Sequence, residues 1–201
     1  MESVSDLTML SAIMAGITLS AAAGLRVFLP ILALGIAVRM GWLEVGEQFA
    51  WLASEPVLII VGIAAMLEAG AYYIPLVDNL LDILATPAAI GGGTVIVASL
   101  LPEMNDLAQW GTALTLGGGS AGIVQTGSVL ARGLSTASSG GLANPLVSTG
   151  ETAGSLFAIA MALLIPIVFG IIVIIALVAL LVWMVRWLRR RKAPTPDTTP
   201  I

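Results

Sequence analysis

The sequence contains no cysteine and no histidine among its 201 residues. These absences exclude disulfide bonds, thiolate and imidazole metal ligands, cysteine nucleophiles and acid–base catalysis by histidine. Charged residues are also scarce, at 10% of the chain, whereas soluble domains carry about 25%. We therefore expect no catalytic residues, no metal site and no cofactor, and the protein is predicted not to be an enzyme.

Apolar residues are abundant instead. They make up 58% of the chain, and the mean hydropathy is +1.04. One transmembrane helix needs about 20 apolar residues, so a chain of this length has room for about five or six crossings. The composition predicts an all-α integral membrane protein whose residues 1–188 form a single transmembrane domain, with at least two of the helices broken or re-entrant.

Basic residues concentrate near the C-terminus, where Arg189, Arg190, Arg191 and Lys192 supply half of the eight Lys and Arg side chains. Because no basic patch with interleaved aromatics is present, no nucleic-acid partner is expected. The cluster is typical of a stop-transfer signal, and the positive-inside rule predicts that it faces the cytoplasm. Residues 189–201 are thus predicted to be a basic end and a disordered Pro/Thr-rich tail of a multi-pass protein in the cytoplasmic (inner) membrane.

The first apolar run, residues 7–38, would be about 48 Å long as a helix, well beyond the ~30 Å of the hydrocarbon core. Glycine and proline weaken a helix, so Gly24 and Pro30 are expected to break this run. The prediction is a spanning helix over about 7–24 and a shorter piece over about 27–39. The shorter piece is predicted to be re-entrant or strongly tilted.

The remaining elements follow from apolar runs and turn signals. Residues 40–56 are expected to be an interfacial loop with Trp42 and Trp51 as aromatic anchors. A glycine cluster interrupts each of two later apolar segments, which predicts broken or closely packed helices. The expected elements are a helix over 57–73 ended by Pro75, apolar segments over 87–101 and 107–133, a Ser/Thr/Gly-rich loop over 134–150, and a long last helix over 151–189 that tilts, kinks at Pro166 or projects.

Two segments resemble each other within the chain, ITLSAAAGLRV at 17–27 and LTLGGGSAGIV at 114–124. Paired glycine-interrupted segments in two halves are typical of transporters with inverted repeats. The alternative is a chance alignment of small residues. The 22 glycines also predict close helix packing, either within one subunit or between the subunits of a homo-oligomer.

Two charges fall inside apolar sequence. Arg26 would cost at least about 2.5–3.5 kcal/mol at the bilayer centre unless it is paired or hydrated. It is predicted either to line a cavity and bind an anionic headgroup or solute, or to snorkel outward from an interface. Glu68 lies in mid-helix and is predicted either to carry a proton or bind a cation, or to neutralise Arg26 or Arg132.

Asp78 and Asp82 stand four residues apart on one helical face, beside Asn79. Their oxygens are suited to a hard cation such as Na⁺, Ca²⁺ or Mg²⁺, although no EF-hand loop surrounds them. The alternative for Asp78 is a cap at the start of a short helix after Pro75.

Arg132, Asn144 and Glu151 supply much of the polar content of the second half and are predicted to line one cavity with Arg26 and Glu68. The alternatives are local. Arg132 would cap the last carbonyls of its own helix, and Glu151 would interact with the N-terminal dipole of the last helix.

Residues from about 10 to 155 resemble an uncharacterised bacterial membrane family, one of the domains of unknown function. The resemblance is carried by the segments AAAGLRVFLPILALGIAVRMG, IPLVDNLLD, AGIVQTGSVLAR and GLANPLVSTGE. The family pattern of Gly-Leu-Arg, Pro-x-x-Asp and Asn-Pro…Glu is matched at Arg26, Asp78, Asn144 and Glu151. Related sequences often carry a histidine near Gln125, and this chain has none. The resemblance implies a fold and a membrane setting and names no substrate.

Two functions are consistent with these features. The first is a small transporter, channel or lipid-translocating protein, with a polar cavity where broken helices meet and an ion, a proton or an anionic small molecule or lipid as substrate. The second is a structural or accessory membrane protein whose buried charges form internal ion pairs. The two differ in whether the charges meet at an accessible cavity or pair off in a dry core.

Overall fold

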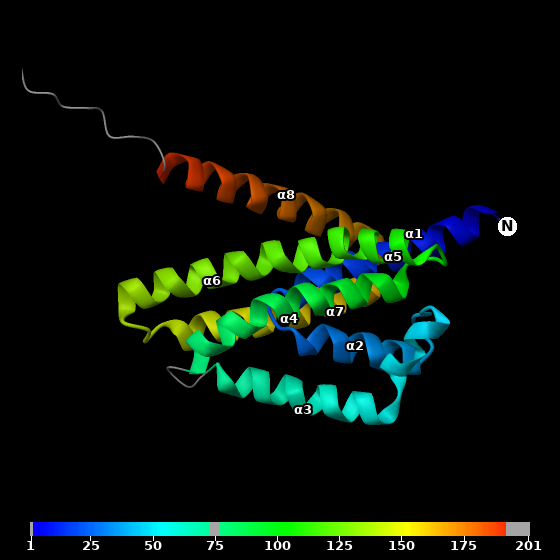
Figure 1. Cartoon of the computed structure of the whole chain (residues 1–201), viewed down its shortest axis with the longest axis horizontal. Coiled ribbons are helices and arrows are strands. Elements are labelled where there is room, and N and C mark those ends of the chain that lie inside the picture. The colour runs from blue at the N-terminus through cyan, green and yellow to red at the C-terminus, as the bar shows by residue number, and fades with distance from the viewer. Residues whose placement is uncertain (1, 73–76, 192–201) are drawn as a thin grey trace, which may run out of the picture.

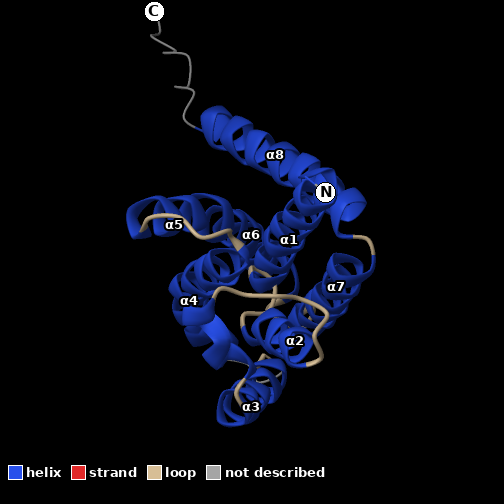
Figure 2. Ribbon diagram, turned by 90° about the vertical axis from the view of Figure 1, so that its right-hand side faces the viewer, coloured by secondary structure: helices blue, strands red, loops and turns tan. Residues whose placement is uncertain are grey.

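A computed structural model describes residues 2–72 and 77–191, and the side chains of 6–72 and 83–189. Within these residues all regular structure is helical (Figures 1 and 2). The elements in chain order are α1 (Glu2–Ala23), α2 (Phe28–Arg39), the 3-10 helix η1 (Glu47–Ala53), α3 (Glu55–Ala71), α4 (Val77–Leu100), α5 (Asp106–Ala113), the π-helix η2 (Leu114–Gly118), α6 (Gly119–Ser139), α7 (Asn144–Leu164) and α8 (Pro166–Arg191).

The helices lie roughly along one common axis and alternate in direction, except that α5, η2 and α6 follow one another in the same direction (Figure 1). One end of the bundle holds the N-terminus, η1 and the connection between α4 and α5, and we call it the N-terminal end. The opposite end holds the connection between α6 and α7 and the end of α8. This arrangement confirms the predicted all-α class.

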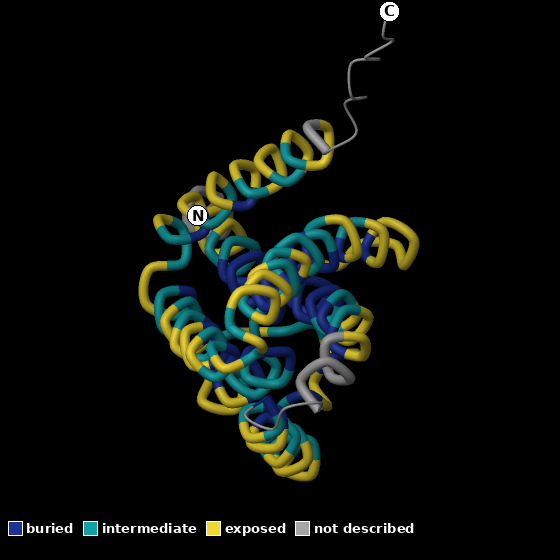
Figure 3. Tube along the Cα trace, turned by 90° about the vertical axis from the view of Figure 1, so that its left-hand side faces the viewer, coloured by how far each residue is buried: buried dark blue, intermediate teal, exposed yellow. Residues whose placement is uncertain are grey.

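α1 lies at the centre of the bundle and packs against α4, α6, α7 and α8. Leu19, Ala22 and Ala23 of its C-terminal half are buried with Ile96 and Val97 of α4 in the main apolar core. Figure 3 shows this buried centre and the exposed outer faces of the surrounding helices. Those outer faces carry many large apolar side chains, as expected where a helix faces lipid.

Four helical segments are long and apolar enough to cross a membrane: Asp6–Ala23, Ile83–Leu100, Asn144–Leu164 and Pro166–Arg189. η1 and α3 would together make a fifth, bent by 59° between them. α2 has 12 residues, or about 18 Å of helix, and begins inside the bundle rather than at its end (Figure 1). Broken and partial spans are therefore part of the fold, as predicted.

The break predicted around Arg26 is confirmed, because α1 ends at Ala23 and α2 begins at Phe28. Gly24 lies at a close crossing, where a Cβ atom would stand 2.4 Å from the carbonyl oxygen of Ala121. Pro30 falls in the first turn of α2, where a backbone N–H has no partner within the helix.

Three predicted element boundaries are wrong. The first concerns α4, which continues from Val77 to Leu100 with Pro87 inside it, so the apolar segment at 87–101 is not a separate helix. Prolines are tolerated within membrane helices because neighbouring groups satisfy the backbone atoms that they leave unpaired. Pro75, predicted to end the preceding helix, lies outside the described residues.

The second wrong boundary is the predicted loop at 134–150. α6 extends to Ser139 and α7 begins at Asn144, so the connection is short. Gly140 and Gly141 have φ angles of 64° and 90°, which favour glycine and end α6 in a left-handed turn. Pro145 then stands in the first turn of α7, a position that proline favours.

The third is the long last helix at 151–189, which is divided between α7 and α8. Ile165 leaves helical geometry, with φ −140° and ψ 58°, and Pro166 begins α8. α8 returns along the bundle in the opposite direction to α7 (Figure 1). The chain therefore reverses direction between Leu164 and Pro166 and forms two helices, instead of one long helix that kinks or projects. The tail at 192–201 lies outside the described residues.

The two similar segments, 17–27 and 114–124, lie side by side and run in the same direction (Figure 1). Ser20 donates a hydrogen bond of 2.9 Å to the carbonyl oxygen of Gly117, 97 positions further along the chain. Gly24 crosses Ala121 at the same offset, which is also the offset of the sequence alignment. This pair therefore has a parallel relation, and the inverted relation expected from the sequence does not hold for it.

Candidate functional site

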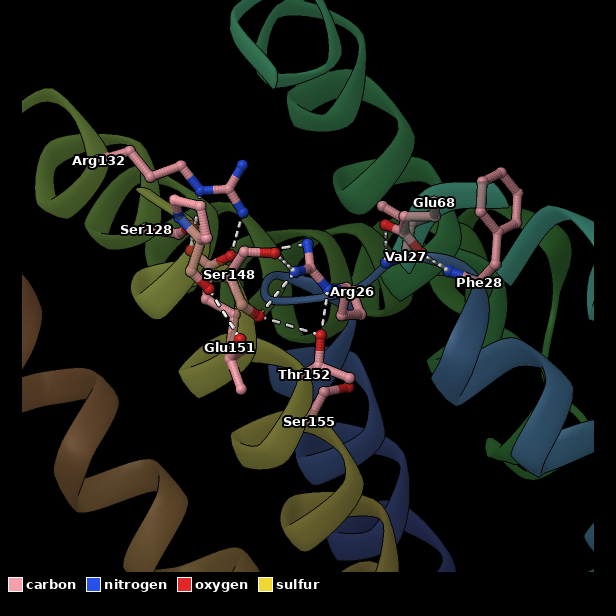
Figure 4. Close-up of polar contacts among 12 residues, drawn as sticks. Arg26, Val27, Phe28, Glu68, Ser128, Arg132, Ser148, Glu151, Thr152 and Ser155 are labelled. Carbon is pink, nitrogen blue, oxygen red and sulfur yellow. Dashed lines mark hydrogen bonds and ion pairs between the residues drawn. The ribbon is translucent and has the colours of Figure 1, made fainter. Parts of the chain in front are cut away.

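Arg26 is fully buried where the chain passes from α1 to α2. Its Nε donates to Thr152 Oγ1 at 2.9 Å, and its Nη2 donates to the carbonyl oxygen and the hydroxyl of Ser148 at 2.8 and 2.6 Å. Its Nη1 lies 3.6 Å from Glu151 Oε2 and has no hydrogen bond to any described residue. The snorkelling alternative is therefore wrong, because α7 holds the guanidinium inside the bundle (Figure 4).

The carboxylate of Glu151 contacts side chains from both halves of the chain. It accepts hydrogen bonds from Ser128 Oγ and from Nε and Nη2 of Arg132, and it also faces Arg26. All four side chains are buried. The local roles considered for Arg132 and Glu151 are wrong, since α6 continues seven residues past Arg132 and α7 begins seven residues before Glu151.

Tyr72, the residue that follows α3, connects the two arginines. The guanidinium carbon of Arg26 lies 4.3 Å from the centre of the Tyr72 ring, and that of Arg132 lies 3.8 Å from it. A tyrosine face attracts cations, more strongly where water is excluded, and Tyr72 is buried. We call Arg26, Tyr72, Arg132 and Glu151 the arginine cluster.

Glu68 has a different partner from those predicted. Its two carboxylate oxygens accept hydrogen bonds from the backbone N–H groups of Val27 and Phe28, at 2.8 and 3.1 Å (Figure 4). These amides open α2, so a side chain of α3 caps the positive end of the half-helix. The N-terminus of α2 is thus occupied by the carboxylate of Glu68.

The other predicted site residues do not join the arginine cluster among the described contacts. Asn144 exchanges hydrogen bonds with Thr136, one turn beyond Arg132 on α6. Asp78 and Asp82 belong to the first turns of α4, and their side chains lie outside the described residues. No group of three His, Cys, Asp or Glu side chains within the described part of the chain is placed to hold a metal ion.

Two hollows flank the arginine cluster. The α3–α4 groove has a volume of about 350 Å³ and an apolar lining apart from Glu68 and Tyr72. The α4–α6 cavity has a volume of about 490 Å³ and includes Arg132, Thr86 and Thr136 in its lining. Tyr72 borders the first hollow and Arg132 the second, so the stacked pair stands between them.

The buried groups of this arrangement are hydrogen-bond donors and acceptors. Guanidinium groups recognise anionic or strongly polar groups by hydrogen bonding. No described histidine or cysteine accompanies them, since the chain has none. The cluster lies within a bundle of membrane-spanning helices, where charged side chains usually mark a substrate or ion pathway.

Four contributors were missed from the sequence: Tyr72, Ser128, Ser148 and Thr152. The predicted loop at 134–150 hid Ser148, although Ser148, Glu151 and Ser155 recur every three or four residues. That spacing is typical of one polar stripe on a helix. All three are buried, which confirms that the stripe faces inward. No signal in the chain indicated Tyr72, since its role depends on two arginines far away in sequence.

One of three comparisons with known proteins gave a match. A family model described as a domain of unknown function, DUF4126, matches residues 13–187. No curated protein and no solved structure matches the chain.

Proposed function

Since the chain belongs to the DUF4126 family, whose description assigns no function, we propose a role from the geometry alone: a small membrane transport protein. Its pathway passes through the arginine cluster, and its substrate is an anionic small molecule or lipid, an ion or a proton. The observation that carries this proposal is the pair of buried arginines sharing Glu151 between two hollows.

The charge distribution supports an orientation for the protein. The N-terminal end holds seven acidic residues and one basic residue, Arg39, whereas five of the eight basic residues follow Val185. The positive-inside rule then puts the opposite end in the cytoplasm and the N-terminus outside. We place the protein in the cytoplasmic (inner) membrane of a bacterial cell. The acidic residues counted are Glu2, Asp6, Glu44, Glu47, Glu55, Glu103 and Asp106.

A matched pair of cysteine variants tests this orientation, because the natural chain has no cysteine. Leu107 at the N-terminal end and Leu142 at the opposite end are each 87% exposed. We expect Leu107→Cys to react with a membrane-impermeant maleimide on intact cells, and Leu142→Cys to react only after the membrane is permeabilised. The reverse pattern would contradict the orientation, and a gel shift of the labelled protein reads out either result.

Reconstitution in liposomes tests transport itself. We expect the protein to move at least one of protons, K⁺, Cl⁻ or fluorescent phospholipid faster than protein-free liposomes allow. Arg26→Gln and Arg132→Gln should each lower that rate by about tenfold or more, because a charge-assisted hydrogen bond contributes about 1.5–3 kcal/mol. Arg39→Gln is the control, since the described contacts of the Arg39 guanidinium are an exposed ion pair of 4.0 Å with Glu55 and an exposed hydrogen bond of 3.3 Å to the carbonyl oxygen of Ala53.

The structural alternative has its own support, because most polar atoms of the arginine cluster already have partners inside the protein. A purely structural cluster predicts that folded protein moves none of these probes. It also predicts that the arginine variants lose stability with no transport defect of their own. Rates equal to those of protein-free liposomes for every probe would refute the transport proposal.

A further inference from the structure

One buried polar atom of the arginine cluster lacks a hydrogen bond. Arg26 Nη1 has no acceptor among the described residues, although the other donors of this guanidinium that are described bind α7. Buried N–H groups are nearly always paired, and charged ones most of all. Arg26 Nη1 lies 3.6 Å from Glu151 Oε2 but makes no hydrogen bond to the described residues, so it is suited to an additional oxygen acceptor from outside the protein.

The α3–α4 groove leads to this position. Val27, next to Arg26 in the chain, lines the groove, and so does Tyr72, which stacks on the Arg26 guanidinium. Both side chains are almost completely buried, so they form the inner end of the groove. The Tyr72 ring is thus the side chain that separates the groove from the guanidinium.

The outer part of the groove faces the region occupied by lipid. Leu67 and Leu84, which line it, are 66% and 59% exposed, and the neighbouring outward face of α3 is also apolar. Four alanines, Ala64, Ala71, Ala85 and Ala88, keep the groove open between the two helices. A dissolved anion would have to cross hydrocarbon to enter here, whereas an acyl chain is already in that medium.

We propose that the α3–α4 groove binds an anionic phospholipid, with an acyl chain along the groove and the phosphate at Arg26 Nη1 once the Tyr72 ring turns aside. The apolar lining and the guanidinium nitrogen that lacks a hydrogen bond together match the two parts of such a molecule. Glu68 stays bound to the α2 amides at the inner end, and the positive end of the half-helix offsets part of its negative charge. This inference rests on the proposed function, because it names the cargo of the same site.

Two Ala→Phe variants test the groove, one at an exposed alanine inside it and one at an exposed alanine elsewhere. Ala88 lies in the groove and Ala179 lies on the outer part of α8, and both are exposed. Purified protein is incubated with equal amounts of phosphatidylglycerol and phosphatidylcholine of the same acyl chains, and native mass spectrometry counts the retained lipid. We expect the natural chain and Ala179→Phe to retain phosphatidylglycerol about tenfold over phosphatidylcholine. Ala88→Phe should lose this lipid.

Equal retention by Ala88→Phe and Ala179→Phe would overturn the inference, and so would equal retention of the two lipids by the natural chain. Arg26→Gln adds a second readout, since it should abolish the headgroup preference. If that variant does not fold, the Ala88→Phe comparison alone decides. Lipid retention without transport in liposomes would refute the proposed function and leave the lipid site standing. If neither the natural chain nor Ala88→Phe retained lipid and Ala88→Phe still transported a soluble ion, the lipid site would be refuted and the proposed function would stand.

Discussion

Glu151→Gln is expected to lower the free energy of unfolding by about 3–5 kcal/mol, the usual cost of leaving buried charges without their partner. The carboxylate serves two buried arginines and Ser128 at once. A neutral amide of the same shape cannot balance either guanidinium, and hydrocarbon surrounds the bundle. The loss is measured by titrating the protein in mixed micelles with a denaturing detergent and following the fluorescence of the five tryptophans.

The matched control is Glu55→Gln, the same substitution at an exposed ion pair. Glu55 lies 4.0 Å from Arg39, and the two side chains are 75% and 52% exposed. Exposed pairs contribute about 0–1 kcal/mol, so this variant should unfold close to the natural chain. Equal losses of stability in the two variants would contradict a strong coupling between Glu151 and the two buried arginines.

Gly117→Ala is expected to lower the free energy of unfolding by about 1–3 kcal/mol through overpacking. A Cβ atom on Gly117 would stand 2.2 Å from the carbonyl oxygen of Gly93 and 2.9 Å from Val97 Cγ2. Backbone cannot yield as a flexible side chain can, so η2 and α4 would have to separate. Since α1 also binds η2 through Ser20, the disturbance should extend to the central helix.

For Gly119→Ala, two residues further along the chain, we expect no loss in the free energy of unfolding. A Cβ atom on Gly119 would meet nothing within 4 Å. Alanine in a helix is favoured over glycine by about 0.5–1 kcal/mol, so this variant should be as stable as the natural chain or more so. Both substitutions are measured by the same detergent titration. A loss in both would indicate that the helix itself, and not its crossing with α4, is sensitive.

The division of α1 from α2 was predictable because its causes are local. Gly24 and Pro30 weaken helix within their own turns whatever surrounds them. The predicted bounds, 7–24 and 27–39, therefore lie close to the observed ones, apart from the start of α1. The long apolar runs were informative for the same reason, since a bilayer requires apolar length in each span regardless of how spans pack.

The loop predicted at 134–150 failed because hydropathy averages over all faces of a helix. Ser148 and its polar neighbours on α7 lower the local hydropathy, yet they point inward to Arg26. A helix with one polar face and a loop then have similar composition. Their difference lies in the spacing of the polar residues, which matters only once a partner for that face is known.

The polar residues of the site were in part visible as single charges in apolar sequence, as with Arg26 and Glu68. The sequence predicted that Arg132 and Glu151 share a site with Arg26. The neutral partners were not visible, because pairing joins residues more than a hundred positions apart for Arg26 and Ser148. Tyr72 became a site residue only through its position between two arginines.

Apolar run length and local helix breakers were thus sufficient to predict the membrane setting, the helical class and the first break. Each of these depends only on the bilayer around the chain or on residues within the same helical turn. Packing alone decided which charges meet, where α8 turns back and why Glu68 caps a half-helix instead of pairing with arginine. In a bundle whose outer surface is as apolar as the lipid around it, hydropathy cannot distinguish alternative helix contacts. Close glycine crossings and a small number of buried polar contacts make that choice.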